Sequence, residues 1–192
     1  MFKKRKQQKV LKVKYGEIAK EFPPLHIAKQ GDVGLDVAVA LPYEENYKEE
    51  LQKYYSNCSY NQITPSEDVV NEIKHGSITI MPGDRALLPT DIKLEIPKGY
   101  WVAVEARSST SKRSLIVPKG VIDEGYRGEI FAQVINIGQT PAVIHHGDRL
   151  VQLILQKSET PDLVIETVDK LSKSERGESG FGSSGSSVIG GM

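Results

Sequence analysis

The chain has 192 residues, enough for one domain with a sizeable buried core. Its 25 basic and 25 acidic residues cancel, so no overall field draws it to nucleic acid or to anionic lipid. A single cysteine, Cys58, excludes an intrachain disulfide. The sequence contains no apolar run of about 18 residues that could span a membrane and no signal-peptide core at its start, so we expect an intracellular, cytoplasmic protein.

The first residues are strongly basic, with Lys3–Lys6 followed closely by Lys9, Lys12 and Lys14. A run of this kind is more often a solvated arm than a nucleic-acid contact. We therefore expect no nucleic-acid partner, although a nuclease or a nucleic-acid binder remains an alternative that rests on this segment alone.

Short apolar or alternating runs, which are typical of β-strands, recur along the chain between Gly, Pro and Asp turn residues. In chain order they are Val10–Val13, Asp36–Leu41, Ser77–Met81, Ala86–Pro89, Ile92–Ile96, Trp101–Glu105, Ser114–Val117, Glu129–Ile137, Ala142–His145 and Leu150–Gln156. Many short strands at close spacing favour an all-β barrel or sandwich, and no alternation with helices supports a doubly wound sheet.

Two segments interrupt this pattern. Tyr43–His75 is polar, with helix formers at Glu44–Tyr55 and a helix start at Ser66, so we predict a partly helical insertion at about 43–76. Residues 172–192 are rich in Ser and Gly, which is typical of a flexible end. We therefore predict a barrel domain over 1–171 and a C-terminal arm over 172–192.

Three segments could carry chemistry. Arg176–Gly185 combines an arginine, glycine amides, hydroxyls and Phe181, a set that suits phosphates and a base, although its composition also fits a disordered tail. Asp123 lies between an apolar strand and a glycine turn, where it is either a turn cap or a general base. Arg107–Ser111 is a donor-rich turn that suits a phosphate chain or is an ordinary polar loop.

Taken together, these segments resemble the dUTP pyrophosphatase family, whose members carry five motifs in fixed order. The corresponding residues are Gly31–Asp36, Ala106–Ser109, Gly120–Glu129, Gly147–Leu153 and Arg176–Gly185. The resemblance implies a homotrimer of jelly-roll-like β-barrels that hydrolyses dUTP to dUMP and pyrophosphate, which limits uracil in DNA and supplies dUMP for dTMP synthesis. It also implies active sites shared between subunits, with the third motif from one chain, the first, second and fourth from another, and the fifth from the third.

The resemblance assigns a role to each site residue. Asp123 activates the water that attacks the α-phosphorus, and Tyr126 packs under the sugar and excludes a 2′-hydroxyl. The backbone of Gly120, Val121 and Ile122 reads the uracil edge. Residues that hold the phosphate chain are Arg107, Ser108 and, close to them, Ser109.

The remaining roles concern the metal and the arm. Mg²⁺ is held mainly by the substrate phosphates, while Asp36 and Gln152 contact it through water and Arg149 supports the site. In the arm, Phe181 covers the uracil ring. The γ-phosphate is clamped by Arg176, Ser183 and Ser184, and Gly182 also binds the substrate.

The chain departs from the family pattern in a few places. Ala106, Ser109 and Ser184 stand where the family often has Pro, Gly and Thr, and the hairpin between residues 111 and 120 is shorter than in many relatives. The insertion resembles the extra segments of some phage members of the family.

Other interpretations remain open at this point. A dCTP deaminase shares the fold but needs a glutamate ten residues after the motif aspartate, where this chain has Gln133, which cannot shuttle a proton. The tyrosine-rich insertion at 43–76 could bind a protein partner or simply cover a barrel edge. The adjacent His145 and His146 point to opposite faces of a strand, so we expect no metal there, and we expect Trp101 in the core.

Overall fold

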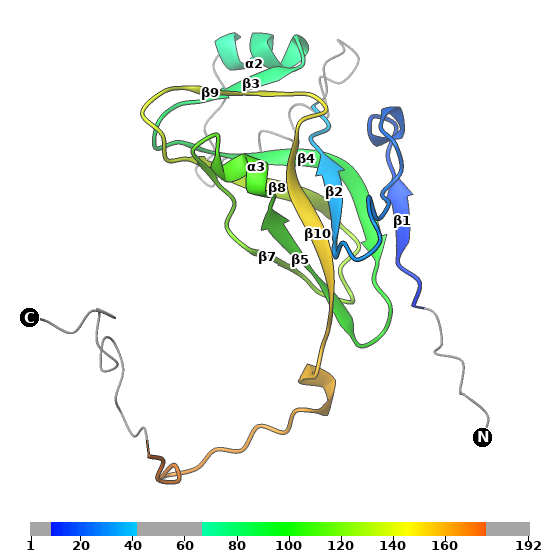
Figure 1. Cartoon of the computed structure of the whole chain (residues 1–192), viewed down its shortest axis with the longest axis vertical. Helices are drawn as coiled ribbons and strands as arrows, with labels where there is room; N and C mark the ends of the chain where they lie inside the picture. The colour runs from blue at the N-terminus through cyan, green and yellow to red at the C-terminus, as the bar shows by residue number, and fades with distance from the viewer. Residues whose placement is uncertain (1–8, 42–66, 176–192) are drawn as a thin grey trace, which may run out of the picture. The chain divides into compact units, whose positions relative to one another are not determined.

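The computed structural model describes residues 9–41 and 67–175. By its contacts the chain divides into two compact units, Met1–Pro161 and Asp162–Met192. The strands that the structure describes all belong to the first unit (Figure 1). The predicted division into a barrel and an arm at residue 171 stays a prediction.

Two four-stranded antiparallel sheets form the body of the first unit. One sheet has the strand order β1 (Lys12–Tyr15), β4 (Arg85–Glu95), β8 (Glu129–Asn136) and β6 (Leu115–Ile116). The other has the order β2 (Gly34–Ala38), β10 (Arg149–Lys157), β5 (Tyr100–Ala106) and β7 (Gly120–Ile122). A further pair consists of β3 (Ser77–Ile80) and β9 (Ala142–His145).

The core lies between the sheets and is almost entirely aliphatic. On β8, buried residues alternate strictly with partly exposed ones, as expected for a strand with one face in the core. Leu88, Ile130 and Leu153, from three different strands, are fully or almost fully buried. The expected all-β, jelly-roll-like barrel is confirmed, whereas the structure adds β7, which the strand pattern did not predict.

The two strands predicted at Ala86–Pro89 and Ile92–Ile96 are one long strand, β4. Its register against β8 shifts between Pro89 and Lys93, and Asp91 within this bulge has φ 54°. The carboxylate of Glu129 accepts the backbone N–H groups of Thr90 (3.2 Å) and Asp91 (2.9 Å) there. The break in the apolar pattern therefore marks a bulge and not a turn between strands.

The predicted helix after Ser66 is present as α2 (Glu67–Lys74), which lies against β3 (Figure 1). Ile73 is fully buried, and the Glu72 carboxylate accepts the Thr79 backbone N–H at 2.7 Å. The helix predicted at Glu44–Tyr55 lies outside the described residues. The described residues also form three short elements, η1 (Ala19–Glu21), α3 (Ser108–Ser111) and η3 (Thr160–Asp162).

One side chain that was expected in the core, Trp101, lies at the surface instead. Trp101 is only partly buried, with the Lys119 ammonium 5.5 Å from its ring centroid, so the expectation that it belongs to the core was wrong. Its neighbour Val102 belongs to the core cluster, and adjacent side chains of a strand point to opposite faces, so Trp101 faces away from that core. Across residues 9–41 and 67–175, no helix is long and apolar enough to cross a membrane.

Candidate active site

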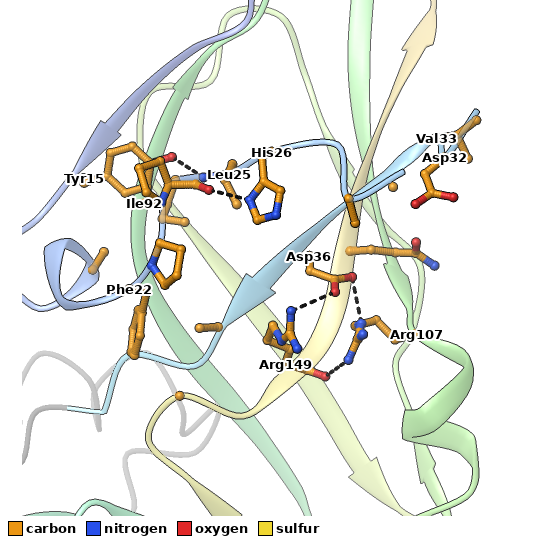
Figure 2. A pocket seen from close by; sticks show the side chains of 18 of the residues that line it. Tyr15, Phe22, Leu25, His26, Asp32, Val33, Asp36, Ile92, Arg107 and Arg149 are labelled. Atoms are coloured by element: carbon orange, nitrogen blue, oxygen red, sulfur yellow. Dashed lines mark hydrogen bonds and ion pairs between the residues drawn. The ribbon is translucent and has the colours of Figure 1, made fainter. Parts of the chain in front are cut away.

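A pocket of about 790 Å³ opens beside β2 and β10 (Figure 2). Its polar end gathers residues that are far apart in the sequence but lie on neighbouring strands, among them Asp36, Arg107, Ser108, Arg149 and Gln152. Its apolar end is formed largely by the segment that precedes β2. The pocket thus combines a site for charged groups with an apolar wall.

The polar end is organised around the Asp36 carboxylate on β2. Arg107 donates from Nε to Oδ1 of Asp36 at 2.7 Å, and Arg149 Nη1 lies 3.4 Å from Oδ2 (Figure 2). Nη1 of Arg107 also donates to the Arg149 carbonyl oxygen at 2.9 Å. The Asp36 carboxylate and the two guanidinium groups together carry a net positive charge, which favours an anion beside them, while Asp32 adds a second carboxylate to the pocket lining.

Arg107 stands directly before α3, and two contacts fix this helix to β10. The Arg107 backbone N–H donates to the Leu150 carbonyl at 3.1 Å, and the buried Thr110 hydroxyl donates to the same oxygen at 2.6 Å. Ser108 lines the pocket, while Ser109 accepts a long bond of 3.4 Å from Nη1 of Arg107. The structure therefore brings these three predicted phosphate-binding residues together.

Gln152 reaches the pocket from β10, where it pairs with Asp36 on one side and Glu105 on the other. Its amide donates from Nε2 to the Ala106 carbonyl at 3.0 Å, which orients the side chain across the sheet. Next to it, Gly34 has no side chain, and a Cβ there would overlap the Gln152 amide oxygen. Gly34 thus leaves the space that Gln152 occupies.

The apolar wall of the pocket was not predicted from the sequence. It includes Tyr15, Phe22, Leu25 and Ile92 (Figure 2). The Tyr15 hydroxyl accepts the Leu25 backbone N–H at 2.7 Å, which holds the segment that follows η1. A Phe-Pro-Pro sequence before the first motif was the one available indication of a fixed, extended segment.

η1 itself is held by Asp91, from the bulge in β4. Its Oδ2 accepts the backbone N–H groups of Ile18 at 3.0 Å and Ala19 at 3.1 Å. On the other side, the Phe22 ring packs against His146, with 4.8 Å between the ring centroids. The bulge that interrupts β4 therefore positions one wall of the pocket.

The turn that carries Asp123 follows β7. Asp123 is exposed, and its carbonyl accepts the Tyr126 backbone N–H at 3.0 Å. The Tyr126 hydroxyl donates to the Glu129 carbonyl at 3.0 Å, and its ring covers Gly128, where a Cβ would overlap the hydroxyl. The Asp123 carboxylate is therefore accessible to water, as a general base that activates a water must be.

The Asp123 turn does not contribute to the pocket within one chain. Of the predicted residues that the structure describes, the lining includes Asp36, Arg107, Ser108 and Gln152. The others are not among the lining residues: Ser109, Gly120, Val121, Ile122, Asp123 and Tyr126. The predicted residues of the arm lie outside the described part of the chain: Arg176, Phe181, Gly182, Ser183 and Ser184.

Glu129, just after the Asp123 turn, has an environment that sequence reasoning did not identify. Burial raises the pKa of its carboxyl, opposed by the backbone N–H groups of Asp91 and Thr90, while the Asp91 charge raises the pKa further. Through these two backbone contacts, the Glu129 side chain connects the end of the Asp123 turn to the bulge in β4.

The described side chains provide few ligands for a divalent cation. Within residues 9–41 and 67–175, no three His, Cys, Asp or Glu side chains are grouped closely enough to hold a metal. Asp36 is the acidic residue at the centre of the polar end, and both of its oxygens already face guanidinium groups. A divalent cation at this end would therefore need ligands besides these side chains, such as phosphate oxygens and water.

The sequence matches a known protein family and several of its members. The dUTPase family model matches residues 72–185, more than half of the chain. A deoxyuridine 5′-triphosphate nucleotidohydrolase of Rabbitpox virus (strain Utrecht) is 42% identical over 107 residues, which cover 56% of this chain and 71% of the relative. The enzyme of the same description from Chlamydia trachomatis serovar D is 42% identical over 111 residues, covering 56% of this chain and 76% of the relative.

Solved structures with the same fold include phage dUTPases. A mutant dUTPase of Staphylococcus bacteriophage 80alpha with dUpNHpp has a TM-score of 0.65 and 22% sequence identity, covering 92% of this chain and 98% of that one. A mutant dUTPase from phage phi11 of S. aureus, described with a structural Mg(II) ion, has a TM-score of 0.59 and 18% identity, covering 85% of this chain and 99% of that one. These likenesses confirm the dUTPase-type jelly-roll barrel.

Proposed function

This chain belongs to the dUTPase family, and we propose that it hydrolyses dUTP to dUMP and pyrophosphate at a site completed by neighbouring copies of the chain. The observation that carries the proposal is the cluster of Asp36, Arg107 and Arg149 at the polar end of the pocket. A carboxylate that holds two guanidinium groups in place creates a preorganised positive site for a polyphosphate.

In this reaction Asp123 acts as the general base. Its carboxylate takes a proton from water while the water oxygen bonds to the α-phosphorus of dUTP. The bond from the α-phosphorus to the oxygen that bridges to the β-phosphorus breaks, and pyrophosphate leaves with the electron pair. Exposure of Asp123 to solvent supports this role because an attacking water can reach its carboxylate.

The phosphate chain is held by Arg107 and Ser108, and Gln152 lies beside them. Mg²⁺, when bound, would neutralise phosphate charge, with Asp36 and Gln152 as the protein groups that hold its waters. Tyr126 selects deoxyribose because its ring, held over Gly128, fills the space that a 2′-hydroxyl needs.

The separation of the Asp123 turn from the pocket supports a composite site. A base and a phosphate cluster that do not meet within one chain can meet between copies of it, and we propose a homotrimer in which they do. The proposed arm, residues 172–192, completes the site through Arg176 and Phe181 of the third copy.

The base assignment is tested with Asp123→Asn, which keeps the shape and removes the basicity. We expect turnover of dUTP to fall by about 10²-fold or more, with dTTP, dCTP and UTP as comparison substrates for the parent protein. Turnover of dUTP by the variant at the parent's rate would remove Asp123 from this role. Release of ammonia from dCTP by the parent would favour a deaminase instead.

The composite site is tested by mixing two inactive chains. One carries Asp123→Asn and the other lacks residues 176–192, so a mixed trimer contains some sites with an intact base and an intact arm. We expect activity to return after subunit exchange, measured together with the oligomer mass by light scattering. Mixtures that exchange subunits but stay inactive would mean that each chain builds its own site.

A further inference from the structure

Glu124, the residue after Asp123, bonds to a distant part of the barrel. Its Oε2 accepts the backbone N–H of Gly99 at 2.7 Å, across 25 residues of sequence. Asp123 is exposed, whereas Glu124 is half-buried. The two neighbouring carboxylates therefore differ: Asp123 is exposed to solvent, whereas Glu124 is bound to the backbone of the barrel.

Gly99 is a firm anchor because it lies in the tight turn between the two long strands β4 and β5. It has φ 76°, a conformation that favours glycine, and the Tyr100 backbone N–H donates to the Pro97 carbonyl at 3.1 Å to close the turn. The Gly99 carbonyl accepts the Ser158 backbone N–H at 2.9 Å. Its peptide groups are thus held from both sides, by Glu124 and by the residue that follows β10.

The Asp123 turn needs such an anchor. The strand before it, β7, has only three residues, and the turn contains Gly125 and Gly128, which leave the backbone much conformational freedom. Within the turn, Arg127 Nη1 donates to the carbonyls of Glu124 at 2.7 Å and Tyr126 at 2.9 Å. These contacts stiffen the turn internally, and the bond from Gly99 to Glu124 fixes it relative to the barrel.

We propose that Glu124 is a positioning residue that holds Asp123 in place for attack on the substrate. This inference rests on the proposed role of Asp123 as the base. A charge-assisted bond to a backbone N–H is stronger than a neutral one, and a small displacement of a catalytic group has a large effect on rate. Gly99 also accepts the Ser158 backbone N–H through its carbonyl, so the Asp123 turn and the end of β10 share this residue as an anchor.

The experiment compares Glu124→Ala with Glu124→Gln and with a matched control, Glu72→Ala. Glu72 also accepts a backbone N–H at 2.7 Å, from Thr79, but it lies between α2 and β3 and not beside Asp123. We expect kcat for dUTP to fall about 10-fold in Glu124→Ala with KM changed less than about twofold, because the base is displaced while the phosphate contacts remain. Glu124→Gln keeps an acceptor oxygen and should restore most of kcat.

Hydrogen exchange provides a readout that does not depend on activity. The Gly99 amide should exchange faster in Glu124→Ala than in the parent and in Glu72→Ala, because it loses its acceptor. If Glu124→Ala does not fold, Glu124→Met, which is similar in length and carries no acceptor oxygen, carries the same expectations. A kcat equal to that of the parent with accelerated Gly99 exchange, or an unchanged Gly99 exchange rate, would overturn the proposal.

The failure of the base assignment is distinguishable from the failure of this inference. If Asp123→Asn retains full turnover, Asp123 is not the base and Glu124 has no base to position. If Asp123→Asn is inactive while Glu124→Ala and Glu124→Met both turn over dUTP like the parent, the base assignment stands and the positioning role is wrong.

Discussion

Gly34 and Gln152 share one space: a Cβ at Gly34 would lie 2.8 Å from the Gln152 side-chain Cδ and would overlap its amide oxygen. The two residues come from paired strands, β2 and β10, and meet at the polar end of the pocket. The orientation of Gln152 therefore depends on the absence of a side chain at Gly34.

A first prediction follows for Gly34→Ala. The added methyl group should push Gln152 off the Ala106 carbonyl and lower kcat/KM for dUTP by about 10-fold. Gln152→Ala should have a similar effect, and the double variant should be no worse than either single one, because both changes remove the same contact. Additive losses in this double-mutant cycle would contradict the shared-space explanation.

A second prediction concerns the geometry of Arg107. Arg107→Lys keeps the charge but replaces two donor atoms, Nε toward Asp36 and Nη1 toward the Arg149 carbonyl, by one, so kcat/KM should fall by about 10-fold or more. Arg113→Lys is the matched control, since Arg113 bridges the Asp148 carboxylate and the Val143 carbonyl outside this pocket. Steady-state kinetics of the two variants decide the question, and equal losses in both would point to a general effect of the substitution.

A third prediction concerns the choice of sugar. Tyr126→Ala should narrow the ratio of kcat/KM for dUTP to that for UTP by about 10-fold, because the ring no longer fills the space beside the 2′-carbon. Tyr126→Phe loses the bond to the Glu129 carbonyl but keeps the ring, so it should discriminate almost as well as the parent. Selection for deoxyribose lies elsewhere if Tyr126→Ala discriminates as strongly as the parent.

A fourth prediction concerns stability and pH. Burial raises the pKa of Glu129 in the folded state, so the folded protein holds this proton at a pH where the unfolded chain, with a pKa of about 4.3, has released it. The resulting stabilisation is fully present below the unfolded pKa and is lost as pH rises through the raised folded pKa. In urea titrations at a series of pH values, the free energy of unfolding of the parent minus that of Glu129→Gln should therefore decrease as pH rises from the unfolded pKa through the folded pKa.

Glu95 is a useful comparison because its pKa is shifted in the opposite direction, downward. Its hydrogen bond and its charge interaction with Lys12 lower its pKa, so its contribution is present above the unfolded pKa and is lost as pH falls through the folded pKa. Glu95→Gln should show the reverse trend, with a smaller amplitude because the pair is exposed to solvent. The same trend in both variants would argue against burial as the cause of the Glu129 shift.

Local sequence patterns predicted much of the fold because they record which face of each strand is buried. Ala142–His145 was predicted with the bounds that β9 has, and the start of α2 followed from the polar residues before Val69. The bulge in β4 was misread as a boundary because Asp91 interrupts the apolar pattern. What holds Asp91 is a carboxylate 38 residues away, Glu129, and local patterns carry no information about such a partner.

Part of the candidate site was predicted from the sequence and part of it was not. The residues at the polar end of the pocket were found because they lie in motifs, and the structure places Asp36, Arg107 and Gln152 together. The apolar wall and the anchor at Glu124 were missed. Both depend on contacts between segments that are distant in sequence, from Tyr15 and Asp91 in one case and from Gly99 in the other.

The way in which α2 is attached has a consequence for how this protein can change over evolution. Leu41 and Ile73 are both fully buried, and Glu72 fastens α2 to β3, so the chain is secured on each side of residues 42–66. The entropy of closing a loop grows only slowly with its length, so a stretch between two secured points can lengthen, shorten or diverge at little thermodynamic cost. We therefore expect the position between Leu41 and α2 to tolerate insertions, deletions or a grafted peptide while the pocket and the Asp123 turn are retained.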